Sequence, residues 1–131
     1  MPQVLCLTES TTLAAIVRRA AGSRGDTVAM LSNRHLTDAT RQTIRQIAPD
    51  IIVIELNTGL DNLPLYLFLR SDDALANARI VVLWPQIELD PQVYMLEADG
   101  YLCHPLTADR VRGLLDTVRL PERQLRFQRA S

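Results

Sequence analysis

Lysine is missing from this chain: all 14 of its basic residues are arginine. No step of chemistry can therefore rest on a lysine ammonium. Acidic residues almost balance the arginines, and the formal net charge of the 131 residues is -1. The chain as a whole has no field that would attract nucleic acid or anionic lipid. We expect no direct nucleic-acid binding by this chain.

Cysteine is scarce as well, with only Cys6 and Cys103, and each lies inside an apolar segment. Two cysteines in a chain with no secretory features rarely form a disulfide. We expect both to be buried thiols on strands too far apart to be bridged.

Apolar segments are short. Those at residues 4–7, 51–54 and 80–83 fall far below the roughly 18 consecutive apolar residues that a membrane helix needs. The first residues also lack the charged and then apolar pattern of a signal peptide. We expect a cytoplasmic protein with no membrane contact. At this length and 47% hydrophobic composition, one domain with a single core is predicted.

Strand and helix signals alternate along the chain. Strands are predicted at residues 4–7, 27–31, 51–54, 80–83 and 101–103. Helices with one apolar face are predicted between and after them. Their expected N-caps are a hydroxyl in residues 8–12, Asp61 or Asn62, Asp90, and Thr107. Gly22, Pro49 and Gly100 are expected to end the first, second and fourth helices.

Strands that are apolar throughout indicate a parallel sheet covered on both faces. We predict a flavodoxin-like (βα)5 three-layer α/β sandwich with strand order 2-1-3-4-5. Residues 1–120 form the predicted domain, and residues 121–131 read as a tail or the start of a linker. Chemistry in such sheets occurs at the carboxyl ends of the strands. The residues expected there are Thr8, Glu9, Ser10, Glu55, Asn57, Trp84 and His104.

The run PDIIVIE at residues 49–55 resembles the third strand of receiver domains in two-component response regulators. In that family a proline and an acid precede four aliphatic residues and an aspartate. Two further landmarks match in order and spacing, namely LRSDD at residues 69–73 and EADGYLCHPL at residues 97–106. The resemblance covers about residues 4–120 and implies the fold predicted above.

The resemblance also implies a phosphoryl-transfer site, and the chain departs from it. Family members accept phosphate on the aspartate that Glu55 replaces, and two acids after the first strand help to hold Mg²⁺. Thr8 and Glu9 occupy those positions. Glu55 carries its carboxylate about 1.5 Å further out, more than near-attack geometry tolerates. We predict a degenerate site with no metal and no catalytic residue.

The switch positions deviate too. Trp84 replaces the family's hydroxyl after the fourth strand, His104 replaces its lysine, and Tyr101 keeps its aromatic. We expect Trp84 to cover the former phosphoryl pocket, with contact to a partner as the alternative. His104 is expected to cap or pair with Glu55. The sequence leaves three roles open for Glu9 and Glu55. They are carboxylates that are solvated or bonded to loop amides, a mimic of the phosphorylated state, or a metal site.

We therefore predict a pseudo-receiver that is not an enzyme and needs no cofactor. It would act in signal transduction by binding a protein partner or a second copy through the fourth helix, fifth strand and fifth helix. A C-terminal output domain in a longer parent is possible. The alternative is a flavin or nucleotide binder, because residues 8–12 resemble the hydroxyl-rich loop of flavodoxins, although they contain no glycine. A Cys103 and His104 hydrolase is excluded because adjacent strand residues point to opposite faces.

Overall fold

The computed structural model describes residues 2–119, and the predicted segment 121–131 lies outside them. Five βα units follow one another along the chain. The strands are β1 (Gln3–Leu7), β2 (Thr27–Leu31), β3 (Ile51–Glu55), β4 (Arg79–Trp84) and β5 (Gly100–Cys103). The helices are α1 (Thr11–Gly22), α2 (Asp38–Ile47), α3 (Leu63–Ser71), α4 (Pro91–Tyr94) and α5 (Ala108–Val118), with a short 3-10 turn, η1 (Asp73–Leu75).

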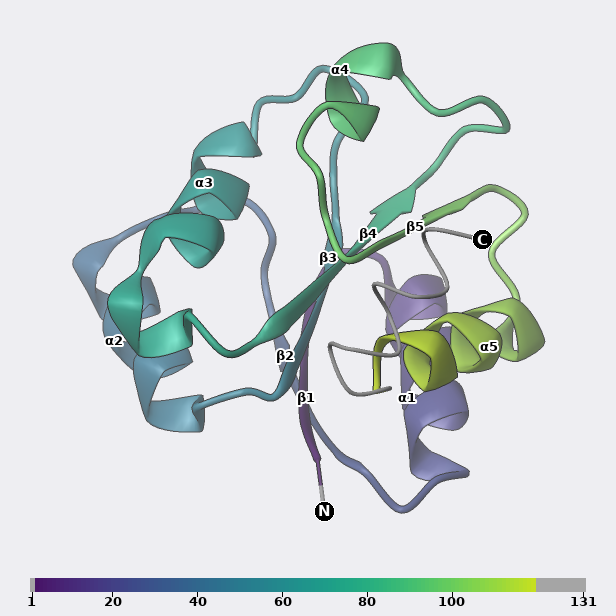
Figure 1. Cartoon of the computed structure of the whole chain (residues 1–131), viewed down its shortest axis with the longest axis horizontal. Coiled ribbons are helices and arrows are strands. Elements are labelled where there is room, and N and C mark those ends of the chain that lie inside the picture. Colours follow the sequence, from purple (N-terminus) through teal and green to yellow (C-terminus); the bar gives the residue numbers. More distant parts are fainter. Residues whose placement is uncertain (1, 120–131) are drawn as a thin grey trace.

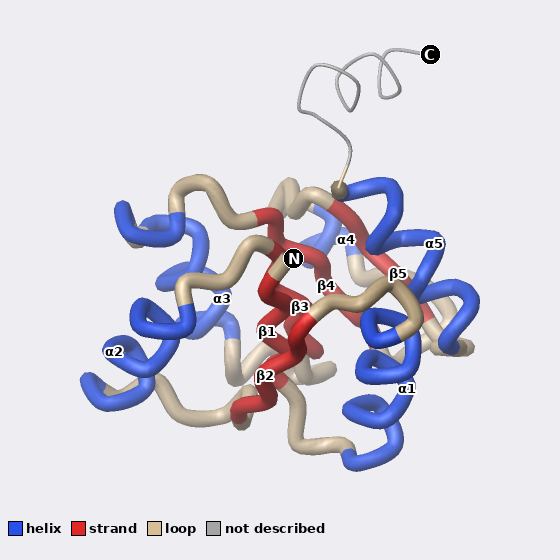
Figure 2. Tube along the Cα trace, turned by 90° about the horizontal axis from the view of Figure 1, so that it is seen from below, coloured by secondary structure: helices blue, strands red, loops and turns tan. Residues whose placement is uncertain are grey.

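The strands form one parallel sheet in the order β2-β1-β3-β4-β5, which confirms the predicted flavodoxin-like topology. Figure 1 shows α1 and α5 on one face of the sheet, with α2, α3 and α4 on the other. Figure 2 shows the same three layers from below. The register brings the carboxyl ends of the central strands together, since Leu7 pairs with Ile54 and Glu55 pairs with Leu83.

Side-chain alternation along each strand divides the core in two. On β3, Ile52 and Ile54 face α2 and α3, whereas Ile51 and Val53 face α1 and α5. All four are buried, as expected for a strand covered on both faces. The polar residues that end these strands are therefore placed at the edge of a rigid, fully packed sheet.

Most helix starts follow the predicted caps. Ser10 accepts the N–H of Leu13 at 3.1 Å, Asp90 accepts that of Gln92 at 2.8 Å, and Thr107 accepts that of Arg110 at 3.2 Å. Asn62 is the exception: it stands at the N-cap of α3 without a side-chain capping bond. Its amide is used at the candidate site instead.

The fourth helix is shorter than predicted. It ends at Tyr94, whereas the sequence suggested a helix closed by Gly100. Glu97 adopts a left-handed backbone with φ of 55°, which turns the chain toward β5 before Gly100 is reached. No helix within residues 2–119 is long and apolar enough to cross a membrane.

Candidate functional site at the carboxyl edge of the sheet

Thr8 and Glu55 meet at the carboxyl edge of β1 and β3. The Thr8 hydroxyl donates to Oε1 of Glu55 at 2.8 Å, and the same hydroxyl accepts the N–H of Ser10 at 3.0 Å. Both side chains are half-buried. The longer carboxylate is thus drawn across the edge of the sheet onto β1, and a hydrogen bond to a charged acceptor holds it there.

Glu9 points away from Glu55. Its Oε1 accepts a hydrogen bond from Ser32 at 2.6 Å and lies 3.6 Å from Nε of Arg34. Glu9 and Glu55 therefore bind different partners at this edge. A Mg²⁺ ion needs a compact set of oxygen ligands, and these side chains do not supply one. In the described part of the chain, no group of three or more His, Cys, Asp or Glu residues could hold a metal ion.

Two buried amides fix the backbone of Glu55. Asn33 and Asn62 donate to its carbonyl oxygen at 2.8 and 2.9 Å, and Asn62 also donates to the carbonyl of Asn33 at 3.1 Å. The Asn62 oxygen accepts the N–H of Asn57 at 3.0 Å. Sequence reasoning singled out Asn57 but missed Asn33, and read Asn62 only as a cap. The signal available in the sequence was that asparagines follow both β2 and β3.

Trp84 is buried at the end of β4, with 1% of its surface exposed. Its indole N–H donates to the carbonyl of Glu88 at 2.9 Å, which satisfies its one polar atom and folds the following loop back over the ring. A side chain this buried cannot be a partner-contacting aromatic in this conformation. The ring belongs to the core on the α2 and α3 face.

His104 lies apart from Glu55. It is exposed, its backbone N–H donates to the carbonyl of Gln86 at 2.9 Å, and the His104–Pro105 peptide bond is cis. Among the described residues no bond joins its imidazole to Glu55, so the predicted pairing is wrong. Thr8 takes that role because its hydroxyl is already within reach on the neighbouring strand.

Tyr101 is tied to the end of α4. Its hydroxyl donates to the carbonyl of Tyr94 at 3.0 Å and accepts the N–H of Ala98 at 2.7 Å, and the two tyrosine rings lie 5.9 Å apart. Burial raises the pKa of Tyr101 above its ordinary value. Tyr101 thus links the end of α4 to the start of β5.

The cysteines are both free, as predicted. Cys6 is buried under this edge, and burial, with a smaller contribution from the charge of Glu55, raises its pKa to about 12. The thiol is therefore protonated and unreactive at neutral pH. Cys103 is only partly buried, less than the sequence suggested.

The fold of this chain is similar to that of solved response regulators. A response regulator from Thermotoga maritima aligns over 90% of this chain and 97% of its own, at 17% identity and a TM-score of 0.73. Chemotaxis response regulator CheY4 of Vibrio cholerae aligns over 91% and 97%, at 21% identity and a TM-score of 0.64. One from Desulfuromonas acetoxidans aligns over 90% and 96%, at 14% identity and a TM-score of 0.69.

At these identities the likeness establishes a shared fold. No protein-family model matches the chain, and no curated protein matches its sequence. The chain thus has the receiver architecture that these solved structures share, and the alternative of a flavin or nucleotide binder is not favoured by them.

Proposed function

We propose that this chain is a receiver-like signalling domain that takes no phosphoryl group on an aspartate and acts by protein contact. The observation that carries the proposal is the 2.8 Å hydrogen bond from Thr8 to Glu55. This bond engages the Glu55 carboxylate with Thr8, at the edge of the sheet where a receiver domain would have its phosphoacceptor aspartate. The fold shared with solved response regulators supports a signalling role.

Three further features support a loss of phosphoryl chemistry. Phosphoryl transfer depends on positioning and on charge neutralisation by metal and cations. Glu9 is held by Ser32, away from Glu55. No lysine exists in the chain, and Trp84 fills the space after β4 with a buried ring instead of an accessible hydroxyl.

Contact is the function that remains for such a scaffold. The segment from β4 through α4 carries three exposed apolar side chains, Ile87, Tyr94 and Met95, which are 75%, 65% and 76% exposed. Large exposed apolar side chains that form a patch mark interaction surfaces. We propose that the α4, β5 and α5 face binds a signalling protein or a second copy of the chain.

Acetyl phosphate with Mg²⁺ tests the phosphorylation part of the proposal. Intact-mass measurement should find no phosphoryl adduct on the full chain, while a phosphorylatable response regulator treated in parallel gains one. A stable adduct that Glu55→Gln abolishes would overturn the proposal.

The contact part is tested by exposed substitutions that leave the core intact. The double variant Ile87→Ser, Met95→Ser should weaken self-association, which sedimentation measures over a range of protein concentrations. If the chain binds a different protein instead, the same variant should weaken the affinity for that partner. Leu67→Ser on α3 is the matched control, since that leucine is 51% exposed. Equal behaviour of the two variants in both measurements would count against this face.

A further inference from the structure

A groove lies between α4 and β5. It has a volume of about 590 Å³ and is lined by Arg70 of α3, by Tyr94 and Glu97, and by residues 98–101. Its size falls in the range of ligand-binding clefts. Tyr94 at its edge is 65% exposed, and the next residue, Met95, is 76% exposed. The groove therefore offers apolar contact beside polar backbone and side-chain groups.

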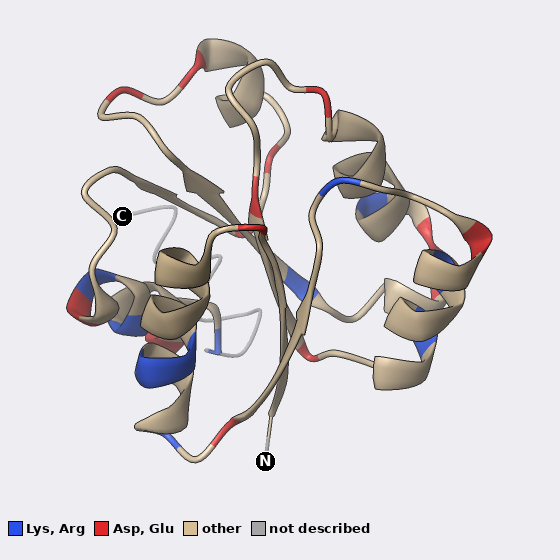
Figure 3. Cartoon of the chain, turned by 180° about the vertical axis from the view of Figure 1, so that it is seen from behind, with Lys and Arg blue, Asp and Glu red and all other residues tan. Residues whose placement is uncertain are grey.

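The surroundings of this groove are acidic. Residues 85–99 contain Glu88, Asp90, Glu97 and Asp99 and no basic residue. Figure 3 shows acidic positions and no basic ones along the loop that leads into α4. A segment that binds here by charge complementarity must be basic.

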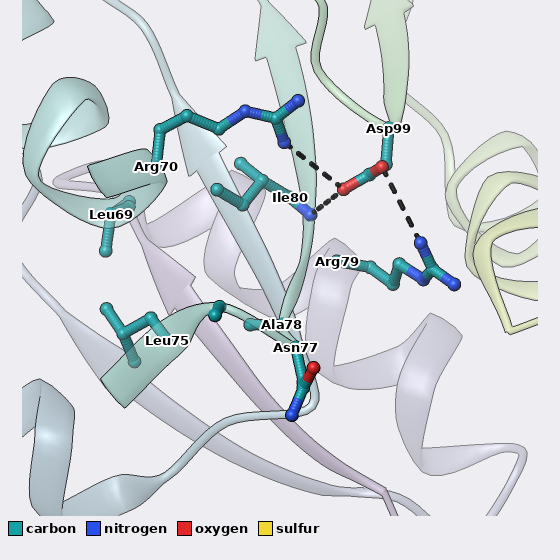
Figure 4. Close-up of a pocket in the computed structure, with 9 residues that line it drawn as sticks. Leu69, Arg70, Leu75, Asn77, Ala78, Arg79, Ile80 and Asp99 are labelled. Atoms are coloured by element: carbon teal, nitrogen blue, oxygen red, sulfur yellow. Dashed lines mark hydrogen bonds and ion pairs between the residues drawn. The ribbon is translucent and has the colours of Figure 1, made fainter. Parts of the chain in front are cut away.

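Arg70 and Arg79 offset the charge of Asp99, so the acids left for a basic segment are Glu88, Asp90 and Glu97. The guanidinium of Arg70 donates to the carbonyl of Glu97 at 2.9 Å and lies 3.8 Å from the carboxylate of Asp99. Figure 4 shows Asp99 between Arg70 and Arg79, at the rim of a neighbouring pocket of about 390 Å³. Asp99 also accepts the N–H of Ile80 at 2.8 Å. Arg70 thus helps to build the wall of the groove.

The end of α5 packs on β5 from the face opposite to the groove. A β-carbon on Gly100 would fall 2.7 Å from Cδ1 of Leu114 and 3.5 Å from Cγ1 of Val118, so α5 covers one face of β5 while the groove lies on the other. Because β5 is the edge strand of the sheet, a segment that follows α5 has only this strand to pass around. Residues 120–131 begin two positions after Val118. Twelve residues can span up to about 40 Å when extended. That length is enough to pass the edge strand β5 and to run along the groove.

The composition of residues 120–131 complements the groove. They contain Arg123, Arg126 and Arg129 against a single acid, Glu122, and two large apolar residues, Leu125 and Phe127. We propose that residues 120–131 bind in the groove between α4 and β5 of the same chain. The arginines meet Glu88, Asp90 and Glu97, and the apolar residues cover Tyr94 and Met95. The inference goes beyond the proposed function, because residues 120–131 would compete with a partner for Tyr94 and Met95, and it holds whether or not Glu55 ever accepts a phosphoryl group.

A spin label at the end of the full chain tests this directly. Ser131→Cys carries the nitroxide in a Cys103→Ser background, and Cys6 stays unlabelled because it is buried with a pKa of about 12. We expect broadening of amide resonances in residues 94–101 and none in α2 on the far side of α3. Replacing Arg123, Arg126 and Arg129 with glutamine in the labelled chain should abolish that broadening.

A second measurement needs no cysteine change. Amide shifts of the natural full chain and of the triple arginine-to-glutamine variant should differ mainly in residues 85–101. Broadening or shift changes spread evenly, or centred on another surface, would overturn the proposal. Broadening that appears when isotope-labelled chain is mixed with spin-labelled chain would assign the groove to a second copy and would also overturn it.

Discussion

Glu55 differs from an aspartate at the same place by one methylene, and a single hydroxyl determines where the longer side chain goes. Thr8 lies on the adjacent strand with its Oγ1 2.8 Å from the carboxylate. An acid at position 8 would repel Glu55, whereas a threonine donates to it. The two departures from the receiver pattern therefore compensate each other, and together they form one structural contact.

Thr8→Val tests that contact, since valine keeps the shape and removes the hydroxyl. A hydrogen bond to a charged acceptor contributes about 1.5 to 3 kcal/mol when desolvated, and this pair is half-buried, so we expect a loss of about 1 to 2 kcal/mol of unfolding free energy. Urea denaturation measures it. Thr8→Ser should retain most of the stability; a valine variant as stable as the natural protein would contradict the assignment.

Single residues also mark what sequence reasoning could and could not reach. The burial of Trp84 was predictable because an indole replaces a small hydroxyl in an apolar strand. The position of His104 was not, because the loop geometry on both sides of β5 decides it. The amide network on Glu55 was missed because asparagines after strands are typical of turns, and only the fold brings Asn33 next to Asn62.

At the scale of elements, α4 is the most dependent on its neighbours. A helix of four residues has no stability of its own. Side chains from α3 and β5 bind the backbone at the end of α4 and just after it. From α3, Tyr66 donates to the carbonyl of Leu96 at 3.0 Å and Arg70 donates to that of Glu97. From β5, Tyr101 donates to the carbonyl of Tyr94. Val93 anchors it in the core. The exposed face of α4 is therefore presented in one orientation.

Tyr66, which holds the end of α4, makes the stability of the folded chain depend on pH. Burial raises the pKa of Tyr66 to about 12 from an ordinary value of 10. Because the folded chain holds this proton more tightly than the unfolded chain, the stabilisation is complete below pH 10 and is lost as pH rises toward 12. Absorbance titration should show a tyrosine ionising near pH 12 that is missing in Tyr66→Phe.

The same variant should lose about 1 kcal/mol at neutral pH, since the carbonyl of Leu96 loses its donor. Tyr94→Phe is the control, because its side chain is largely exposed and should change little. If the step near pH 12 survives in Tyr66→Phe, the assignment is wrong.

At the scale of the whole molecule, polar links join α1, α5 and the loop before β2 on one face of the sheet. Arg24 pairs with Asp116, Arg112 donates to Ser23 at 3.0 Å, and Arg119 pairs with Asp26, whose side chain has no exposed surface. The last pair connects the end of α5 to the start of β2. It thereby ties Arg119, the last residue that the structure describes, to the loop before the sheet's first edge strand.

Arg119→Gln should be strongly destabilising, because it leaves the Asp26 carboxylate buried without its cation. We expect a loss of about 3 kcal/mol in urea denaturation. Adding Asp26→Asn should recover part of it, since the buried charge is then removed. Asp38→Asn, at an ion pair with a 98% exposed carboxylate, should cost less than about 0.5 kcal/mol. Equal costs for the two sites would contradict the account.

The topology of the whole molecule was predictable because strands apolar at every position alternate with one-sided helices, and that pattern has few solutions. Each predicted strand lies within one residue of the observed bounds. The end of α4 was not predictable, because the bonds that stop it come from Tyr66 and Arg70, more than 25 residues earlier in the chain. Local patterns cannot contain such contacts.

The central claim is that the carboxyl edge of this sheet no longer reads a phosphoryl group. Titrating the isotope-labelled full chain with beryllofluoride and Mg²⁺, and following its amide resonances, tests that claim most directly. We predict that the resonances around Thr8, Glu55 and Trp84 stay in place up to saturating ligand. Saturable shifts centred on those three residues and spreading to Tyr101 would show a working phosphoryl site and contradict it.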